Sequence, residues 1–329
     1  MRLGAARPPL VLLLAAAAAL LAGARCGSRA GPVALPGAPR CPLMPIDSYW
    51  HADVRNLPVH PRSDAWVAAI GADSPVHPDF GSGLWDGGPI GIPYTTAGAE
   101  TPAVAVALGY AEESDPGPYP IPPDPPIEGG PDADGDRHVL VVERDACVLY
   151  ELFDAHPQPD GSWWAGSGAI FDLLGYDLRP SGWTSADAAG LPILPGLVRH
   201  DEVAAGRVGH AIRFTAPLTQ RAFVWPARHF ASTSTDPDRP PMGAWFRLKG
   251  SVDPASFSPA VQPIVVALQR HGMLLADNGS SWFLSGVPDE RWDNDALREL
   301  RGLTGLDFEA VDASSLMDDP DSARLRPGP

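Results

Sequence analysis

The chain has 329 residues, which is enough for one large domain or two small ones with a full hydrophobic core. Hydrophobic residues make up 44% of it and charged residues 19%, which excludes a wholly disordered chain, and 39 prolines with 34 glycines are too many for a helical bundle. The formal net charge is −16 and Lys249 is the only lysine, so a protein that binds the phosphate backbone of nucleic acids is disfavoured.

The first 24 residues have the pattern of a secretory signal. Arg2 and Arg7 precede an apolar stretch over residues 10–21, and the small residues 22–24 provide a cleavage site. This apolar stretch is shorter than the roughly 20 residues that span a bilayer. We therefore predict an extracellular protein without a membrane span.

Residues 25–40 are rich in glycine, proline and alanine and are predicted to form a flexible spacer. They contain Cys26, whereas the other two cysteines, Cys41 and Cys147, flank segments that we expect to be ordered. In an oxidising compartment Cys41 and Cys147 are the expected disulfide, with two unpaired buried thiols as the alternative.

Short strand signals dominate residues 41–312, which we interpret as a single domain. Residues 138–143 and 147–153 predict a hairpin whose nearly continuous apolar content requires cover on both faces. Further strands are predicted at 168–173, 209–215, 221–225, 244–249, 273–277 and 281–284, and helices at 64–70, 201–205, 259–269 and 293–301.

Two biased segments interrupt or follow these signals. The proline-rich residues 115–131 suit a domain linker or a long surface loop, and the similar strand signals on either side favour the loop. Residues 313–329 are predicted to be an acidic, disordered tail. The fold prediction is therefore mainly β: a single-domain antiparallel β-sandwich of jelly-roll type with a few short peripheral helices.

The sequence lacks the common motifs of cofactor and metal chemistry. It contains no G-x-G-x-x-G after a strand, no P-loop, no H-E-x-x-H and no G-x-S-x-G. Residues 132–136 alternate carboxylates like the start of a calcium loop, but Arg137 stands where that loop needs a glycine, which favours a plain acidic turn. We expect no cofactor and no metal.

One stretch of this acidic chain is basic. Residues 207–249 carry seven basic and two acidic side chains. The stretch includes His210, Arg213, Arg228 and His229, which are candidates to bind an anionic or hydroxyl-rich ligand or to remove a proton from it. The alternative is that the arginines pair with carboxylates elsewhere in the protein.

Tryptophans and carboxylates complete the candidate site. Trp225 and Trp282 are candidate platforms, because planar rings stack on the apolar faces of sugars, although a single tryptophan is more often part of a core. Asp277 ends an apolar strand before the turn Asn278-Gly279, and Glu151 lies inside a strand, where an acid is costly unless it is paired or functional. The structural alternatives are a turn-forming aspartate and a buried ion pair.

Five segments resemble a family of secreted, β-rich proteins of actinobacteria and related bacteria for which no activity is established. They are residues 115–130, 135–145, 178–199, 223–229 and 276–282, and the resemblance extends over roughly residues 41–312. It implies a single secreted unit, it is consistent with pairing of Cys41 with Cys147, and it assigns no catalytic residue.

The residues favour a secreted glycan-processing enzyme, either a glycoside hydrolase or a polysaccharide lyase. Asp277 and Glu151 are the candidate acid, base or nucleophile of a hydrolase, which needs one protonated and one ionised carboxyl group. A lyase needs a cation such as Arg213 or Arg228 and a base such as His210 or His229. The alternatives are a non-catalytic carbohydrate-binding or cell-wall protein and a structural or inhibitor protein. We expect a monomer whose partner is a polysaccharide.

Overall fold

The structure is a computed structural model that describes Met1 and residues 32–327. The predicted secretory signal, apart from Met1, and Cys26 lie outside the described residues. Among those described, no helix has both the length and the apolar character needed to cross a membrane.

The largest sheet has six strands in the order β1-β14-β11-β13-β12-β15. Residues 273–276 in β13 are fully buried, because this apolar strand has neighbours on both sides and is covered on both faces. β11 runs parallel to β13, and a register shift after Phe214 places Thr215 opposite Asp277. The strands of this sheet are His77–Asp79 (β1), Ile212–Ala216 (β11), Trp245–Leu248 (β12), Met273–Asn278 (β13), Phe283–Ser285 (β14) and Phe308–Val311 (β15).

A second sheet has the order β10-β7-β6-β4 and separates two hydrophobic clusters. Leu140 and Val142 of β6 belong to the main core, whereas Val139 and Val141 on the opposite face belong to the smaller one. The predicted hairpin covered on both faces is therefore confirmed. The strands are Tyr94–Ala97 (β4), Val139–Glu143 (β6), Val148–Phe153 (β7) and Ser167–Asp172 (β10).

The described part of the chain has two further small sheets, one of three strands and one of two. A three-stranded sheet, β5-β9-β8, contributes Trp163 and Ala165 to the smaller core, and β2 pairs with β3 in a hairpin. Their bounds are Leu84–Trp85 (β2), Gly88–Pro89 (β3), Val106–Leu108 (β5), His156–Pro157 (β8) and Trp163–Ala165 (β9).

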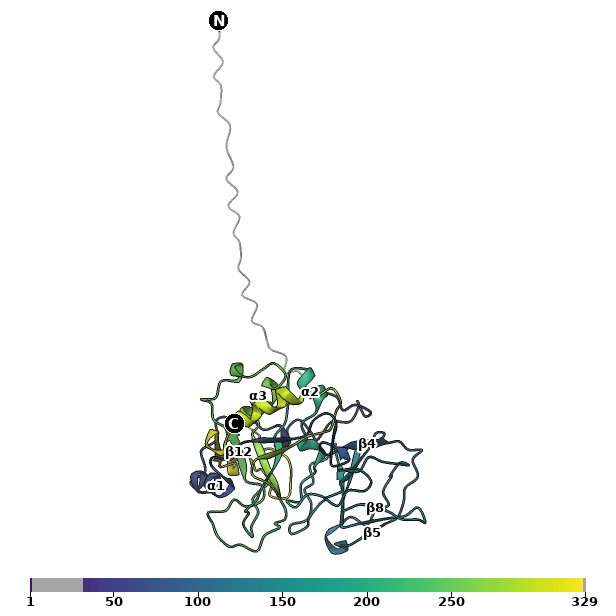
Figure 1. Cartoon of the computed structure of the whole chain (residues 1–329). Helices are drawn as coiled ribbons and strands as arrows, with labels where there is room; N and C mark the ends of the chain where they lie inside the picture. Colours follow the sequence, from purple (N-terminus) through teal and green to yellow (C-terminus); the bar gives the residue numbers. More distant parts are fainter. Residues whose placement is uncertain (2–31, 328–329) are drawn as a thin grey trace. The chain divides into compact units, whose positions relative to one another are not determined.

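Helices are few and short. α3 contacts both β12 and α2 (Figure 1), and it begins at Gln262 rather than at residue 259, with Pro263 in its first turn, where a missing N–H costs nothing. The α-helices are Ser63–Ile70 (α1), His200–Ala204 (α2), Gln262–Arg270 (α3) and Asn294–Leu297 (α4). The 3₁₀ helices are Tyr49–His51 (η1), Ala111–Glu113 (η2), Leu194–Gly196 (η3), Pro254–Ser256 (η4), Arg298–Gly302 (η5), Gly305–Asp307 (η6) and Ser314–Leu316 (η7).

The fold is mainly β with several sheets and few short helices, but the jelly-roll sandwich is not confirmed. Within the described chain, the pairs β1–β14, β11–β13, β4–β6 and β5–β9 are parallel. Both larger sheets therefore contain parallel as well as antiparallel pairs, because strands that are distant in the sequence lie next to each other. No strand forms at residues 221–225, where Phe223 makes an isolated bridge to Met242.

The chain from Pro32 onward forms one compact unit. Leu35 and Ala38 are buried, and so is Ala323, whose N–H donates to the carbonyl of Tyr176. The predictions of a flexible spacer at 25–40 and a disordered tail at 313–329 were therefore wrong for residues 32–40 and 313–327. A few buried small or apolar side chains anchor segments whose overall composition suggests mobility.

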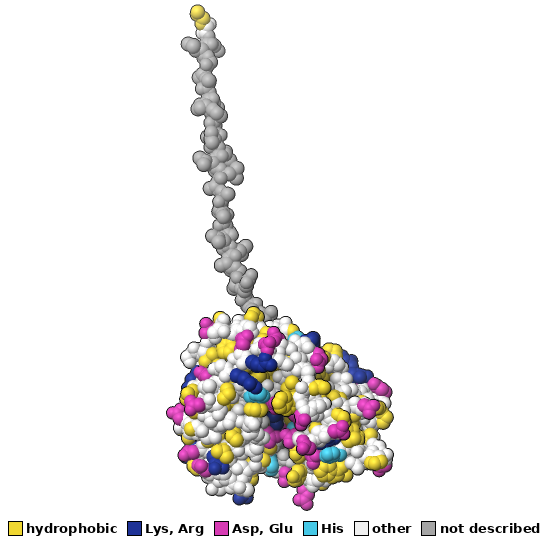
Figure 2. Space-filling view, in the orientation of Figure 1, with side chains coloured by type: hydrophobic (Ala, Val, Ile, Leu, Met, Phe, Trp, Pro, Cys, Tyr) yellow, Lys and Arg dark blue, Asp and Glu magenta, His cyan; other side chains and the backbone are white. Residues whose placement is uncertain are grey.

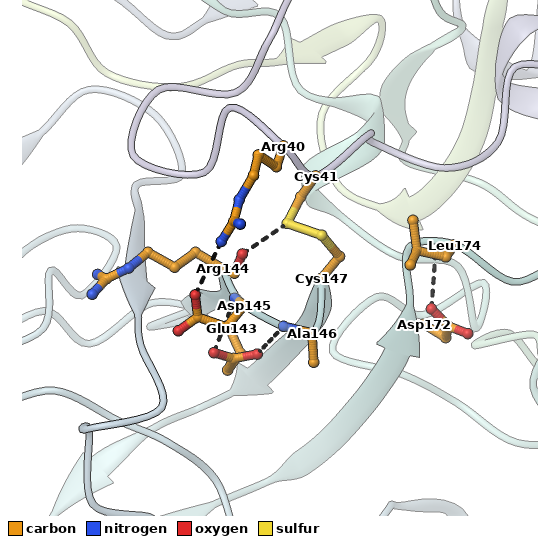
Figure 3. Close-up of a disulfide and its surroundings, with 9 residues drawn as sticks. All are labelled: Arg40, Cys41, Glu143, Arg144, Asp145, Ala146, Cys147, Asp172 and Leu174. Atoms are coloured by element: carbon orange, nitrogen blue, oxygen red, sulfur yellow. Dashed lines mark hydrogen bonds and ion pairs between the residues drawn. A yellow bond between two sulfur atoms is a disulfide. The ribbon is translucent and has the colours of Figure 1, made fainter.

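The predicted disulfide between Cys41 and Cys147 is present, with a Cα–Cα distance of 5.1 Å (Figure 3). It ties the N-terminal segment to the turn of the β6–β7 hairpin. In that turn Glu143 accepts hydrogen bonds from the N–H groups of Asp145 and Ala146, and Arg40 pairs with Asp145. A disulfide of this kind is compatible with an extracellular location.

Replacing both Cys41 and Cys147 by alanine should lower the free energy of unfolding by about 2–5 kcal/mol, because the disulfide restricts the unfolded chain over a separation of 106 residues. Urea unfolding of the oxidised protein and of the variant measures the difference. The same comparison under reducing conditions is the control and should show a much smaller one. Equal stability of the oxidised forms would contradict the prediction.

Candidate active site

A buried arginine, Arg213 of β11, joins three side chains beside the six-stranded sheet. Its Nε donates to Oδ2 of Asp187 at 2.9 Å, Nη1 donates to Oγ of Ser285 at 2.8 Å, and Nη2 donates to Oδ2 of Asp277 at 3.1 Å. Asp277 and Ser285 belong to the neighbouring strands β13 and β14, whereas Asp187 comes from the loop between β10 and η3. Arg213 therefore ties that loop to the sheet.

Side-chain hydrogen bonds hold the Asp187 loop in place. Ser185 Oγ accepts the N–H of Asp187 at 2.9 Å and donates to the carbonyl of Leu191 at 2.7 Å, and Ser167 donates to the carbonyl of Ser185 at 2.6 Å. Asp187 is thus positioned both by its own loop and by Arg213.

His138 and Glu128 form a second pair beside Arg213. His138 is buried, with Nδ1 2.5 Å from Oε2 of Glu128 and Nε2 3.0 Å from the carbonyl of Ala186. Both neighbours are acceptors, so both ring nitrogens carry protons and the imidazole is charged. Burial alone would lower the pKa of His138, but the Glu128 carboxylate outweighs it and raises that pKa to about 9.

Asp277 and Glu128 are partly open to solvent and have opposite electrostatic environments. Their side chains are 21% and 25% exposed. Burial raises the pKa of Asp277 to about 7, and the Asp187 carboxylate adds to the rise against the attraction of Arg213. Burial also acts to raise the pKa of Glu128, but His138 and Arg213 outweigh it and hold that pKa below its ordinary value. Near neutral pH, Asp277 is partly protonated while Glu128 is ionised.

Glu151 interacts electrostatically with Asp187 and His138 and has no exposed surface. Its carboxyl oxygens accept the N–H groups of Ile193 and Leu194 at 2.9–3.0 Å. Burial raises the pKa of Glu151 to about 7, against the effect of these hydrogen bonds. The predicted ion pair with an arginine is not formed, because backbone donors satisfy the carboxyl group instead.

The structure brings four of the predicted site residues to this region. Asp277 and Arg213 are in direct contact, and Glu151 is a buried neighbour that interacts electrostatically with Asp187. His229 donates from Nδ1 to the carbonyl of Ala188, so it contacts the Asp187 loop. The raised pKa and partial exposure of Asp277 fit the acid role better than the sealed position of Glu151 does.

The side chains of the other four make structural contacts, although the backbone N–H of Arg228 also donates to the carbonyl of Ala189 in the Asp187 loop. His210 is buried against Glu202 at 3.1 Å, and Trp282 is fully buried, stacked on Phe214 and Phe308. Arg228 and Trp225 hold the C-terminal segment, donating to Pro320, Asp321 and Ser322. The assignments of His210 as a base, of Arg228 as a substrate-binding cation and of Trp225 and Trp282 as stacking platforms do not fit these contacts, since the side chains are already engaged within the protein.

Asp187, Glu128 and His138 are not among the candidate site residues that the sequence predicts. Asp187 lies in a loop without a chemical motif, and Glu128 lies within a proline-rich stretch whose composition suggests a surface loop. One sequence feature could have drawn attention to Glu128: it is an ionisable residue followed by two glycines, and it lies ten residues before His138, after which a strand begins. Composition alone does not reveal that these segments meet.

In the view of Figure 2, acidic side chains gather in the middle of the visible face, between the regions that carry the labels β12 and β4 in Figure 1. Among residues 32–327, no three His, Cys, Asp or Glu side chains are grouped so that they could hold a metal ion. Comparison with protein-family models, curated proteins and solved structures finds no match to this chain.

Arg213→Met should lower the free energy of unfolding by about 3–5 kcal/mol, because it leaves the carboxyl group of Asp187 buried without its cation. Combining it with Asp187→Asn should recover part of that loss. Urea unfolding measures both.

The matched control is Arg298→Met, since Arg298 is exposed and pairs with Asp295 at the surface. This substitution should lower the free energy of unfolding by at most about 1 kcal/mol. If the Arg213 variant is no less stable than the Arg298 variant, the structural role given to Arg213 is wrong.

Proposed function

We propose that the protein is an exported glycoside hydrolase that cleaves an extracellular glycan, with Asp277 as general acid and Glu128 as the ionised carboxylate. One observation carries the proposal: two partly exposed carboxyl groups each pair with a buried cation, Asp277 with Arg213 and Glu128 with His138. In these surroundings the pKa of Asp277 is raised and that of Glu128 is lowered. Paired carboxyl groups with separated pKa values are the usual acid and base of glycosidic cleavage.

Each group has a separate task in this chemistry. Asp277 donates a proton to the glycosidic oxygen as the bond to the anomeric carbon breaks. Water attacks the anomeric carbon and gives a proton to the Glu128 carboxylate, so that a hydroxyl group replaces the leaving sugar, and the negative charge of Glu128 stabilises the positive charge that develops on the sugar. His138 is a positioning residue, because its charged ring holds Glu128 ionised and its other nitrogen fixes Ala186, next to Asp187.

Hydrolysis suits these contacts better than elimination from a uronic acid. A lyase needs a cation that is available to the substrate carboxylate, but all three guanidinium nitrogens of Arg213 already donate to protein oxygens. Arg228 is likewise engaged by Arg179, Pro320 and Asp321. His229 is the remaining candidate base, but neither Arg213 nor Arg228 has a guanidinium group available to bind the substrate carboxylate beside it.

An exposed tryptophan provides the platform that Trp225 and Trp282 do not. Trp85 is 78% exposed on the β2–β3 hairpin. In that hairpin, a Cβ atom placed on Gly88 would lie only 2.0 Å from the backbone of Gly129, so the hairpin rests on the residue that follows Glu128. Its exposed ring is available to stack on a sugar bound at Asp277 and Glu128, which we call the acidic site.

Asp277→Asn and Glu128→Gln should each reduce the rate of glycan cleavage at least about a hundredfold, the usual contribution of a general acid or base. The assay incubates the protein with neutral and uronic-acid polysaccharides and measures reducing ends and ultraviolet absorbance. The control, Asp318→Asn, changes an exposed carboxylate of the C-terminal segment and should leave the rate unchanged.

The pH profile of the same reaction should be bell-shaped. Activity rises at acidic pH as Glu128 ionises and falls through about pH 7 as Asp277 loses its proton. New absorbance together with reducing ends would show elimination instead of hydrolysis. Retention on a glycan without cleavage would show a binding protein, and unchanged cleavage by both variants would refute the assignment of Asp277 and Glu128.

A further inference from the structure

The loop that carries Glu128 also borders a hollow of about 720 Å³. Ile127 and Gly130 line the hollow, and Glu128 lies between them in the sequence, turned to His138. The acidic site and the hollow therefore share one short loop.

The walls of this hollow are rigid and apolar. Eight of its fifteen lining residues are prolines, which have a fixed φ and no backbone N–H to donate. Ile121, Ile127, Val104 and Trp163 provide further apolar surface, and Asp124 is the single charged residue in the wall. A ligand here finds apolar contacts and few hydrogen-bond donors.

The exposed β2–β3 hairpin adds to this apolar surface. Pro89 lines the hollow and pairs with Leu84, which is 69% exposed and precedes Trp85 in β2. The same hairpin rests on Gly129. Apolar groups thus continue from the hollow to the residues that flank Glu128.

We infer that the hollow binds the hydrocarbon chain of an alkylated or acylated saccharide, whose sugar lies at Asp277 and Glu128. This rests on the proposed function. A bare sugar suits the hollow poorly, because its hydroxyl groups need donors as well as acceptors, and an anionic group would meet Asp124 without a compensating cation in the wall. A hydrocarbon chain requires neither and is stabilised by each methylene group that it buries.

Calorimetric titration with octyl β-glucoside below its micelle concentration and with methyl β-glucoside tests this inference. The two probes share one sugar, so their difference isolates the chain. The octyl compound should bind at least tenfold more tightly than the methyl compound. Pro102→Asp, which puts a charge in the wall of the hollow at an exposed position, should abolish that difference.

The control is Pro61→Asp, a matched change at an exposed proline outside the hollow, which should retain the tenfold difference. Equal binding of the two glucosides, or a difference that survives Pro102→Asp, would overturn the inference. The titration measures binding rather than cleavage, so its result is distinguishable from a test of whether Asp277 and Glu128 are catalytic. If the octyl glucoside binds more tightly but Asp277 and Glu128 prove not to be catalytic, only the proposed function is refuted. If Asp277 and Glu128 are catalytic but the two glucosides bind equally, only the inference about the hollow is refuted.

Discussion

The arrangement of the acidic site depends on the burial of one positive charge. Removing a guanidinium group from water is costly, and Arg213 offsets that cost through hydrogen bonds to Asp187, Asp277 and Ser285. These contacts fasten the Asp187 loop to the six-stranded sheet. Glu151, from the other large sheet, binds the N–H groups of Ile193 and Leu194 farther along the same loop. The loop is therefore bonded to both sheets.

The electrostatic difference between Asp277 and Glu128 follows from this constraint. Asp187 and Asp277 share a single cation, so each carboxylate disfavours ionisation of the other, and burial acts in the same direction. Glu128 has a cation of its own in His138, whose second nitrogen is held by the carbonyl of Ala186. One carboxyl group retains its proton near neutral pH and the other is ionised. This is a chemical property of the folded arrangement and is absent from either segment alone.

Local features of the fold could be predicted from the sequence, whereas features that depend on distant contacts could not. The β6–β7 hairpin and the Cys41–Cys147 pair follow from apolar runs and cysteine positions. Parallel pairing of β11 with β13 joins segments about sixty residues apart, which no local pattern specifies. The same limit applies to the site. Asp277 stands out at a strand end, but no local pattern shows that Trp282 is occupied by the core and Arg228 by the C-terminal segment.

The most direct test of this electrostatic arrangement is a carbon-13 NMR titration of the side-chain carboxyl groups, with the signals of Asp277 and Glu128 assigned from Asp277→Asn and Glu128→Gln. The account predicts a midpoint near pH 7 for Asp277 and a midpoint below the ordinary glutamate value for Glu128. If both groups titrate together near their ordinary values of about 4, burial beside Asp187 and the pairing of Glu128 with His138 do not separate them, and the account is contradicted.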